Sequence, residues 1–287
     1  MKIRNNRNAS NLCLLCNLRP SNKTKSHIIQ KAVANKILLV DGKNEGYVFT
    51  TESKYSRKSP IQDSPKEDYI LCTECEEYFS KLETYFSDKF YNKLWIPVSQ
   101  SGFIPIENGQ DQSLLCKEIN SSIFQLYLCS IFWRISICDF FGKKEELNEL
   151  RPILADYLIK CQGKDIQDII EKTLLPQDNK NPLSFIICAT KFPIGNNGII
   201  LFNNIQEIYY LFLGSFVINF SFNMYNFPSY LNAVLNYGSR EGLRIKLIDE
   251  EFYFKLNMMM MTEKQLENLK HFADSYLKDV IPNTLQV

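Results

Sequence analysis

Two pairs of cysteines with metal-binding spacing carry the clearest chemical signal in this chain. Cys13 and Cys16 form one Cys-x-x-Cys motif, and Cys72 and Cys75 form the other. Each motif places two thiolates on one tight turn, and two such turns complete the tetrahedral set of four sulfurs that is typical of structural zinc. We therefore predict that one structural Zn²⁺ is bound by these four side chains.

The other five cysteines stand singly among apolar residues, and the opening residues are polar, unlike the apolar core of an export signal. This pattern favours a reducing, cytoplasmic location, in which paired cysteines bind metal more often than they form disulfides. Disulfide pairing of the four motif cysteines is the alternative.

A histidine lies between the two motifs. His27 is one of only two histidines in the chain, and we expect it in a short strand over residues 24–29. The sequence leaves three roles open for it: a further metal contact, a structural histidine with satisfied hydrogen bonds, or a general base. The second histidine, His271, falls in a predicted helix over residues 262–277, where a surface or packing role is expected.

Positive charge is concentrated at the start of the chain. The formal net charge is only +1, but residues 1–40 hold eight Lys or Arg and no Asp or Glu. Such a segment attracts anions, and cations that neutralise phosphates drive salt-sensitive binding to nucleic acid. A solvated surface loop is the alternative. We predict nucleic-acid contacts through the basic residues near the first motif and His27, namely Arg4, Arg7, Arg19, Lys23, Lys25 and Lys31.

Residues 12–90 resemble the zinc-knuckle form of HNH endonucleases. The resemblance is carried by the first Cys-x-x-Cys motif and by the segments Ser26-His27-Ile28-Ile29 and Leu71-Cys72-x-x-Cys75-Glu76. A weaker similarity to an uncharacterised, HNH-like group of bacterial proteins extends to about residue 160 and includes Trp133-Arg134.

The resemblance implies a small treble-clef zinc domain that cuts phosphodiester bonds with one divalent ion, Mg²⁺ or Mn²⁺. On this pattern His27 would activate water as the general base, and Glu76 occupies the position that meets the catalytic metal. Asp63 and Glu83 are further carboxylates that could share the ion, since Mg²⁺ prefers oxygen ligands.

Three residues depart from the family pattern. Ser26 stands where an aspartate usually helps to bind the metal, Gln30 replaces a proline, and Glu76 replaces Asn or His. Three interpretations therefore stay open. The first is a metal-dependent nuclease that cleaves DNA or RNA, as a bacterial anti-phage defence protein or toxin. The second is a catalytically inactive, zinc-stapled protein that binds nucleic acid or acts as an adaptor. The third is a structural or protein-interaction module.

The chain is predicted to be α+β, with an HNH-like zinc domain over residues 1–96, a polar linker over 97–112 and a larger domain over 113–287. The larger domain begins with helices, continues with β-rich sequence, and is expected to regulate or to bind a protein partner. Hydrophobic periodicity predicts helices over 30–39, 73–93, 114–141, 144–160, 165–174 and 262–277. Strands are expected over 69–71, 183–190, 198–202, 208–213, 216–222 and 243–248, and a long loop over 41–68.

The most apolar stretch, residues 121–142, contains Gln125, Arg134 and Asp139. Charges at such depth are costly in lipid, so we expect a buried core helix and no membrane partner. Asp139 is poorly placed to pair with Arg134 on one helix face, so Arg134 is expected to reach a different element. A run of four methionines at 258–261 is expected to fill core space.

Overall fold

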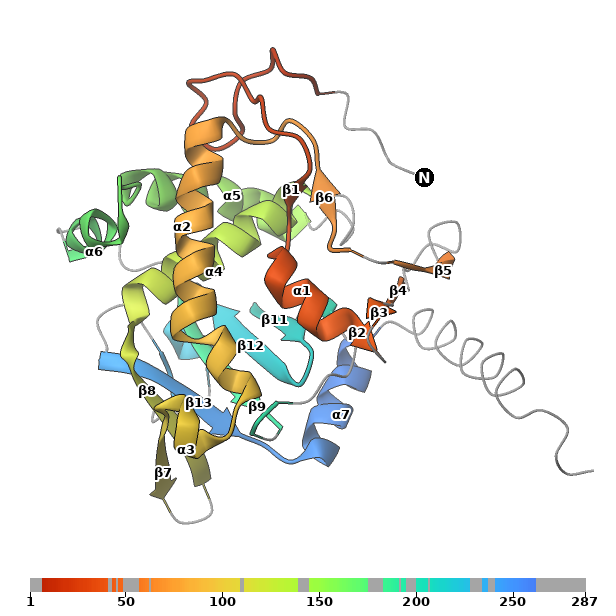
Figure 1. The fold of residues 1–287 in the computed structure, drawn as a ribbon, viewed down its shortest axis with the longest axis vertical. Helices are drawn as coiled ribbons and strands as arrows, with labels where there is room; N and C mark the ends of the chain where they lie inside the picture. The colour runs from red at the N-terminus through yellow and green to blue at the C-terminus, as the bar shows by residue number, and fades with distance from the viewer. Residues whose placement is uncertain are drawn as a thin grey trace, which may run out of the picture.

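The computed structural model describes residues 7–40, 43–44, 46–48, 57–61, 63–108, 111–138, 145–174, 183–190, 192–194, 200–205, 207–227, 234–236 and 241–261. Helices and a large sheet are both present, which confirms the α+β class (Figure 1). Within this part of the chain, no helix is both long and apolar enough to cross a bilayer.

The helices contribute most of the N-terminal half and the middle of the described chain. They are α1 (Lys31–Leu38), α2 (Thr73–Lys89), the 3-10 helix η2 (Tyr91–Trp95), α3 (Val98–Ser101), α4 (Ser121–Ile137), α5 (Glu145–Lys160), α6 (Ile166–Leu174), the 3-10 helix η4 (Met224–Asn226) and α7 (Glu250–Met260).

The main sheet has seven strands in the order β10-β11-β12-β9-β13-β8-β7. All neighbours are antiparallel except β13 and β9, which are parallel. The strands are β7 (Ile104–Asn108), β8 (Asp111–Asn120), β9 (Ser184–Ala189), β10 (Ile200–Ile205), β11 (Ile208–Leu213), β12 (Phe216–Ser221) and β13 (Glu241–Leu247).

Three small two-stranded sheets lie earlier in the chain. They pair β1 (Ser26–His27) with β6 (Lys66–Glu67), β2 (Leu39–Val40) with β3 (Lys43–Asn44), and β4 (Gly46–Val48) with β5 (Arg57–Ile61). The stretch predicted as one long loop over 41–68 therefore contains short strands among its described residues.

The main sheet is buried on both faces at its centre. Alternate residues of a strand point to opposite faces. Phe185 and Ile187 of β9 join the large core that includes α2 and α4, whereas Ile186 and Cys188 join a smaller cluster with Tyr253 of α7. This two-sided burial explains why these strands read as continuous apolar runs.

Helix α4 is the buried centre of the molecule. Every residue from 121 to 135 is buried, which confirms the predicted core helix. Its start was predicted wrongly, because residues 111–120 form β8 and the helix begins at Ser121. The Asn120 side chain sets this boundary by accepting hydrogen bonds from the backbone N–H groups of Ser122 (2.9 Å) and Ile123 (3.2 Å).

One hydrophobic cluster extends from Cys13 near the start of the chain to Ile245 in β13. Aromatic pairs connect its parts: Phe86 of α2 stacks on Tyr127 of α4 at a centroid distance of 3.9 Å, and Tyr91 lies 6.1 Å from Phe216 of β12. The predicted domains 1–96 and 113–287 thus share a core. The predicted linker over 97–112 contains α3, β7 and the start of β8 instead of a bare connector.

Three other expectations need correction or lie outside the description. Residues 69 and 70 are bends and residue 71 has no regular structure, so no strand forms there, and Tyr69 has the left-handed φ of 57°. Helix α7 was not predicted, and of its methionines Met260 is buried whereas Met258 and Met259 are largely exposed. The predicted helix over 262–277 lies outside the described residues.

The shared core makes a prediction about stability. Phe86→Ala should lower the free energy of unfolding by ~3–5 kcal/mol, because it removes a fully buried ring that contacts both Tyr127 and Phe124. Urea unfolding followed by circular dichroism measures this change. Phe254→Ala is the control, since Phe254 is 64% exposed on α7. Equal effects of the two substitutions would contradict the shared core.

Candidate functional site

The four motif cysteines converge at one point. The sulfur atoms of Cys13, Cys16, Cys72 and Cys75 all lie within 4.8 Å of one another, and all four residues are buried. The Cys16 and Cys72 sulfurs are 3.8 Å apart, which is the separation that Zn–S bonds of about 2.3 Å give in a tetrahedron. The thiols are free rather than paired in disulfides. The donor set therefore fits a four-coordinate zinc ion.

Local backbone structure brings the two motifs together. In the first turn, the Cys13 N–H donates to Arg19 O (2.7 Å), and Asn17 takes the left-handed φ of 51° that reverses the chain. In the second, Cys72 is the N-cap of α2 and Cys75 lies in its opening turn, where the helix dipole favours negative sulfur. A hydrogen bond from Leu14 N to Ile70 O (2.9 Å) joins the two turns.

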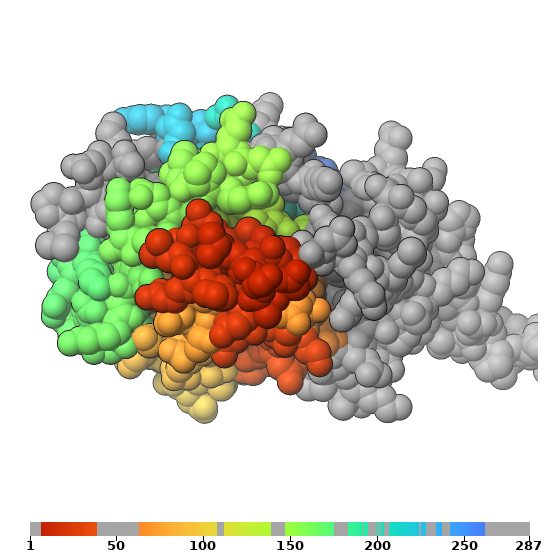
Figure 2. All heavy atoms as spheres, turned by 90° about the horizontal axis from the view of Figure 1, so that it is seen from above, coloured from red at the N-terminus to blue at the C-terminus, as the bar shows by residue number. Residues whose placement is uncertain are grey.

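Three thiols of the cluster, those of Cys13, Cys72 and Cys75, have strongly shifted pKa values. A hydrogen bond from Cys75 lowers the pKa of Cys13 to about 5, and the same contact raises the pKa of Cys75. Burial raises the pKa of Cys72 to about 11. Four buried thiolates would repel one another, and binding of a divalent cation to deprotonated sulfur removes that repulsion. Figure 2 views the molecule from this end. The described N-terminal residues, in red, form one patch there, which borders orange residues around the second motif and green residues from the middle of the chain.

His27 lies in β1, with Lys66 of β6 as its cross-strand partner, and the neighbouring Ser26 bonds Glu76 of α2, one residue after Cys75. Its Nδ1 hydrogen-bonds the Ser64 hydroxyl and lies 3.9 Å from Asp63 Oδ1, and the side chain is 24% exposed. Within the described part of the chain no group is bonded to Nε2. The imidazole is therefore fixed through one nitrogen, which leaves the other available to a reactant.

The surroundings of His27 favour its neutral form. Burial lowers the pKa of His27, and the charge of Lys66 lowers it further, while Asp63 and Glu83 partly oppose this shift and Lys31 adds to it. Asp63 itself bonds the ammonium of Lys66 and the backbone N–H of Ser64 (2.8 Å). A neutral imidazole at pH 7 is the form that can accept a proton.

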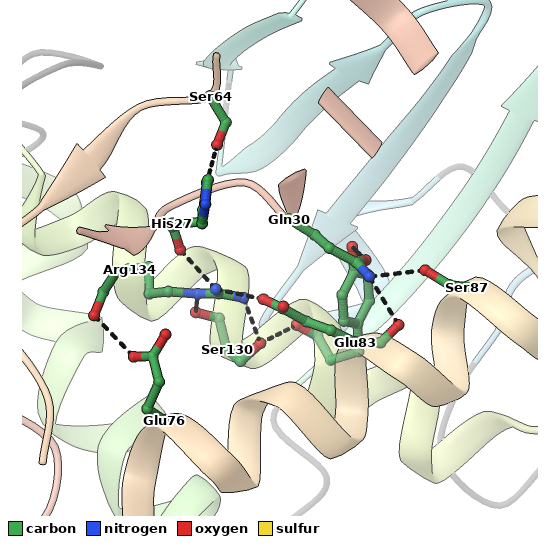
Figure 3. A network of polar contacts seen from close by, with 10 residues as sticks. His27, Gln30, Ser64, Glu76, Glu83, Ser87, Ser130 and Arg134 are labelled. Atoms are coloured by element: carbon green, nitrogen blue, oxygen red, sulfur yellow. Dashed lines mark hydrogen bonds and ion pairs between the residues drawn. The ribbon is translucent and has the colours of Figure 1, made fainter. Parts of the chain in front are cut away.

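The two glutamates of α2 make other contacts. Glu76 Oε2 accepts a hydrogen bond from the Ser26 hydroxyl (2.8 Å), and Glu83 Oε1 lies 2.6 Å from the Arg134 guanidinium. The ring of His27 points toward Ser64 and away from both glutamates (Figure 3). The structure thus brings Asp63 to His27, but not Glu76 or Glu83. Among the described residues, only the four cysteines form a group of three or more Cys, His, Asp or Glu side chains that could hold one metal ion.

The predicted nucleic-acid residues fall into two groups. Arg7 donates to the backbone carbonyls of Tyr69 (2.7 Å) and Leu12, and Arg19 pairs with Glu74 at 3.2 Å. These arginines brace the two cysteine turns. Lys25 and Lys31 are exposed near His27 and Lys23 is partly exposed, whereas Arg4 lies outside the described residues. Nucleic-acid contact by this set stays a prediction.

Two site residues were not singled out from the sequence as partners of His27. Ser64 and Lys66 reach it only because β1 pairs with β6, and that pairing has no local signal beyond polar residues around Pro65. The sequence did point to Arg134, because it is a charged residue inside an apolar run. The expectation that it reaches a different element is confirmed by its bond to Glu83 of α2.

Comparisons of this chain with protein-family models, with curated proteins and with solved structures found no match. The similarity of residues 12–90 to HNH endonucleases therefore rests on the motifs themselves and stays an expectation.

The cysteine cluster predicts a defined metal content. The purified chain should contain about one zinc per molecule by elemental analysis, and Cys75→Ser should lose most of it, because three sulfurs complete no tetrahedron. Cys188→Ser is the matched control, since Cys188 is a buried cysteine of β9 outside the cluster. Equal zinc content in the two variants would contradict the assignment.

The charges around His27 predict opposite effects of two substitutions on its pKa. In zinc-loaded protein, Lys66→Met should raise the pKa of His27, because a nearby positive charge is removed, and Asp63→Asn should lower it. Titration of the imidazole by NMR measures both shifts, and His271→Gln assigns the two histidine signals. Lys25→Met removes an exposed charge and should leave the pKa unchanged. Shifts of the same sign for Lys66→Met and Asp63→Asn would contradict the geometry.

Proposed function

We propose that this protein is a zinc-stapled nuclease in which His27 is the general base. The observation that supports it is the partly exposed imidazole that Ser64 and Asp63 orient, in a strand tied to the helix that carries Cys75 by the Ser26–Glu76 hydrogen bond. An oriented histidine with a lowered pKa in a basic setting is suited to accept the proton of an attacking water. The resemblance of residues 12–90 to HNH endonucleases points to the same reaction.

Each residue near His27 has a defined part in this proposal. In this proposal Nδ1–H donates to the Ser64 hydroxyl oxygen, which leaves Nε2 unprotonated to take the proton from water as the water attacks phosphorus and the bond from phosphorus to the leaving oxygen breaks. The lysines around the site, Lys25 and Lys31 above all, would hold phosphates through charge. A Mg²⁺ or Mn²⁺ ion, when bound, would supply charge neutralisation at the phosphate and leaving oxygen. Asp63 is the carboxylate nearest to His27 that could hold it.

A second candidate function is binding of nucleic acid without cleavage. It is favoured by the contacts of Glu76 with Ser26 and of Glu83 with Arg134, which engage two of the three carboxylates expected at a catalytic ion. In this alternative the zinc-bound turns and the lysines form a phosphate-binding or adaptor surface. The defence or toxin role and the cytoplasmic location belong to the proposal and derive from the resemblance and from cysteine usage.

Cleavage assays distinguish the two candidates. Purified protein should nick plasmid DNA or cut structured RNA with Mg²⁺ or Mn²⁺ and stop in EDTA. His27→Ala should reduce the rate by roughly 10²–10⁴-fold, the usual contribution of general base catalysis, with zinc content unchanged. His271→Ala, which removes the only other histidine, should retain full activity. Equal rates for wild type and His27→Ala on every substrate would overturn the nuclease proposal.

The binding-only alternative has its own signature. Affinity should fall with salt, and the slope of log affinity against log salt should decrease by about 0.9 for each lysine–phosphate contact removed from a duplex. Lys31→Ala tests one such contact, while Lys255→Ala removes a lysine of α7 that pairs with Glu251 and serves as control. Salt-dependent binding with no cleavage would select this alternative.

A further inference from the structure

The guanidinium of Arg134 lies at the junction between α4, α2 and the strand that carries His27. Its NH1 donates to the backbone carbonyl of His27 (2.7 Å) and to Glu83 Oε1 (2.6 Å). Its other nitrogens bond the carbonyl and hydroxyl of Ser130 (3.2 and 3.3 Å), and the group lies over the Phe79 ring at 5.2 Å. Figure 3 shows the side chain reaching between these partners.

We propose that Arg134 is a positioning residue for His27, so that the candidate active site is completed by a helix outside residues 1–96. This inference rests on the proposed function for its catalytic consequence. The positioning itself is a separate, structural claim, because it concerns the backbone and ring of His27 whether or not a phosphodiester is cut.

The surroundings of Arg134 argue for such a role. Its side chain is 3% exposed and is the only charged one in a mostly apolar helix, and buried ion pairs are often no more stabilising than apolar residues of similar volume. A core-filling role would thus not need a charge here. The guanidinium instead bonds a backbone carbonyl 107 residues away, at the one strand residue whose side chain the proposed reaction uses.

The strand itself is too short to fix the imidazole. β1 has two residues, which pair with Lys66 and Glu67 of β6, and the pairing is extended by single backbone bonds from Ile28 N to Pro65 O (2.9 Å) and from Tyr69 N to Lys23 O (2.8 Å). Short strand pairs are marginal without packing support. Arg134 provides that support by donating a hydrogen bond to the His27 carbonyl. Gln30, three residues after His27, adds a second tie by donating to Ser87 Oγ (2.7 Å) and Glu83 O (3.0 Å) of α2. The imidazole is therefore held at its ring by Ser64, and its backbone carbonyl is held by Arg134.

The test uses the full chain with zinc bound and the variant Arg134→Lys. Lysine keeps the positive charge beside Glu83 but lacks the planar fork that also reaches the His27 carbonyl. We expect the imidazole ¹⁵N signals of His27 at about pH 8, where the ring is neutral, to move or broaden. We expect kcat to fall on the order of a hundredfold with KM unchanged, because the ring is displaced.

Arg151→Lys is the matched control. Arg151 of α5 also bonds a backbone carbonyl, that of Ser136 in α4, but it does not contact His27. This control should keep the wild-type His27 signals and kcat. A folded Arg134→Lys protein with wild-type signals and wild-type kcat would overturn the proposal.

A second variant guards against loss of folding. Glu83→Met combined with Arg134→Met removes both charges, so neither is left buried alone, yet the His27 carbonyl still loses its donor. The same changes in the His27 signals are expected, with circular dichroism and zinc content reporting the fold. If wild-type protein does not cleave any substrate, the nuclease proposal fails, and the His27 signals alone decide the role of Arg134.

Discussion

Four buried sulfur atoms within 4.8 Å of one another impose the constraint on which the N-terminal part of this molecule depends. They come from two turns far apart in the sequence, and thiolates this close repel one another unless a cation lies between them. A bound zinc ion would convert that repulsion into the strongest link between residues 7–25 and the start of α2. The short strand β1 begins at Ser26, ten residues after Cys16, and the Ser26 hydroxyl bonds Glu76 beside Cys75, so the position of His27 is linked to the same convergence.

The large hydrophobic core supplies the second fixed reference. Helix α2 follows its N-cap Cys72, holds Cys75 in its first turn, and carries Phe86 near its other end, where that ring stacks on Tyr127 of α4. The cysteine cluster and the seven-stranded sheet are thus joined through one rigid helix. This geometry differs from two independent domains on a linker, because the Arg134 bond to the His27 carbonyl and the Tyr127 hydroxyl's bond to Gln30 Oε1 (3.4 Å) cross the same contact that the aromatic rings fill.

Local patterns predicted those parts of the fold that are determined locally. The helices α1, α2, α5 and α6 and the strands β9, β11, β12 and β13 lie close to their predicted ranges, because periodicity and apolar runs are local signals. β8 was mistaken for helix because its Leu114, Leu115 and Cys116 continue into the apolar run of α4. The start of α4 was marked only by Asn120, a good N-cap residue.

In the candidate site, too, only the features that the local sequence encodes could be predicted. Cysteine spacing identified the metal-binding set, since each turn is encoded by four residues. The contact of His27 with Ser64 joins residues 37 positions apart, and the contact with Arg134 joins residues 107 apart. Such contacts depend on strand pairing and helix packing, which no local pattern encodes. Motif resemblance singled out His27, whose functional role stays a prediction, but it could not place the carboxylates around it.

Two of the three departures from the pattern of HNH endonucleases, Ser26 and Glu76, contact each other, and this bears on the choice between cleavage and binding. The Ser26 hydroxyl donates to Glu76, so the two residues that stand where the family would hold its metal satisfy each other. A neutral donor beside a carboxylate needs no cation, whereas an aspartate in place of Ser26 would. Hydrolysis at this site would therefore use the opposite side of β1, where Asp63 faces the imidazole and Lys66 lies across the strand pair. If that side binds no divalent ion, the same lysines and the oriented ring remain suited to hold a phosphate, which leaves binding as the function that the geometry allows.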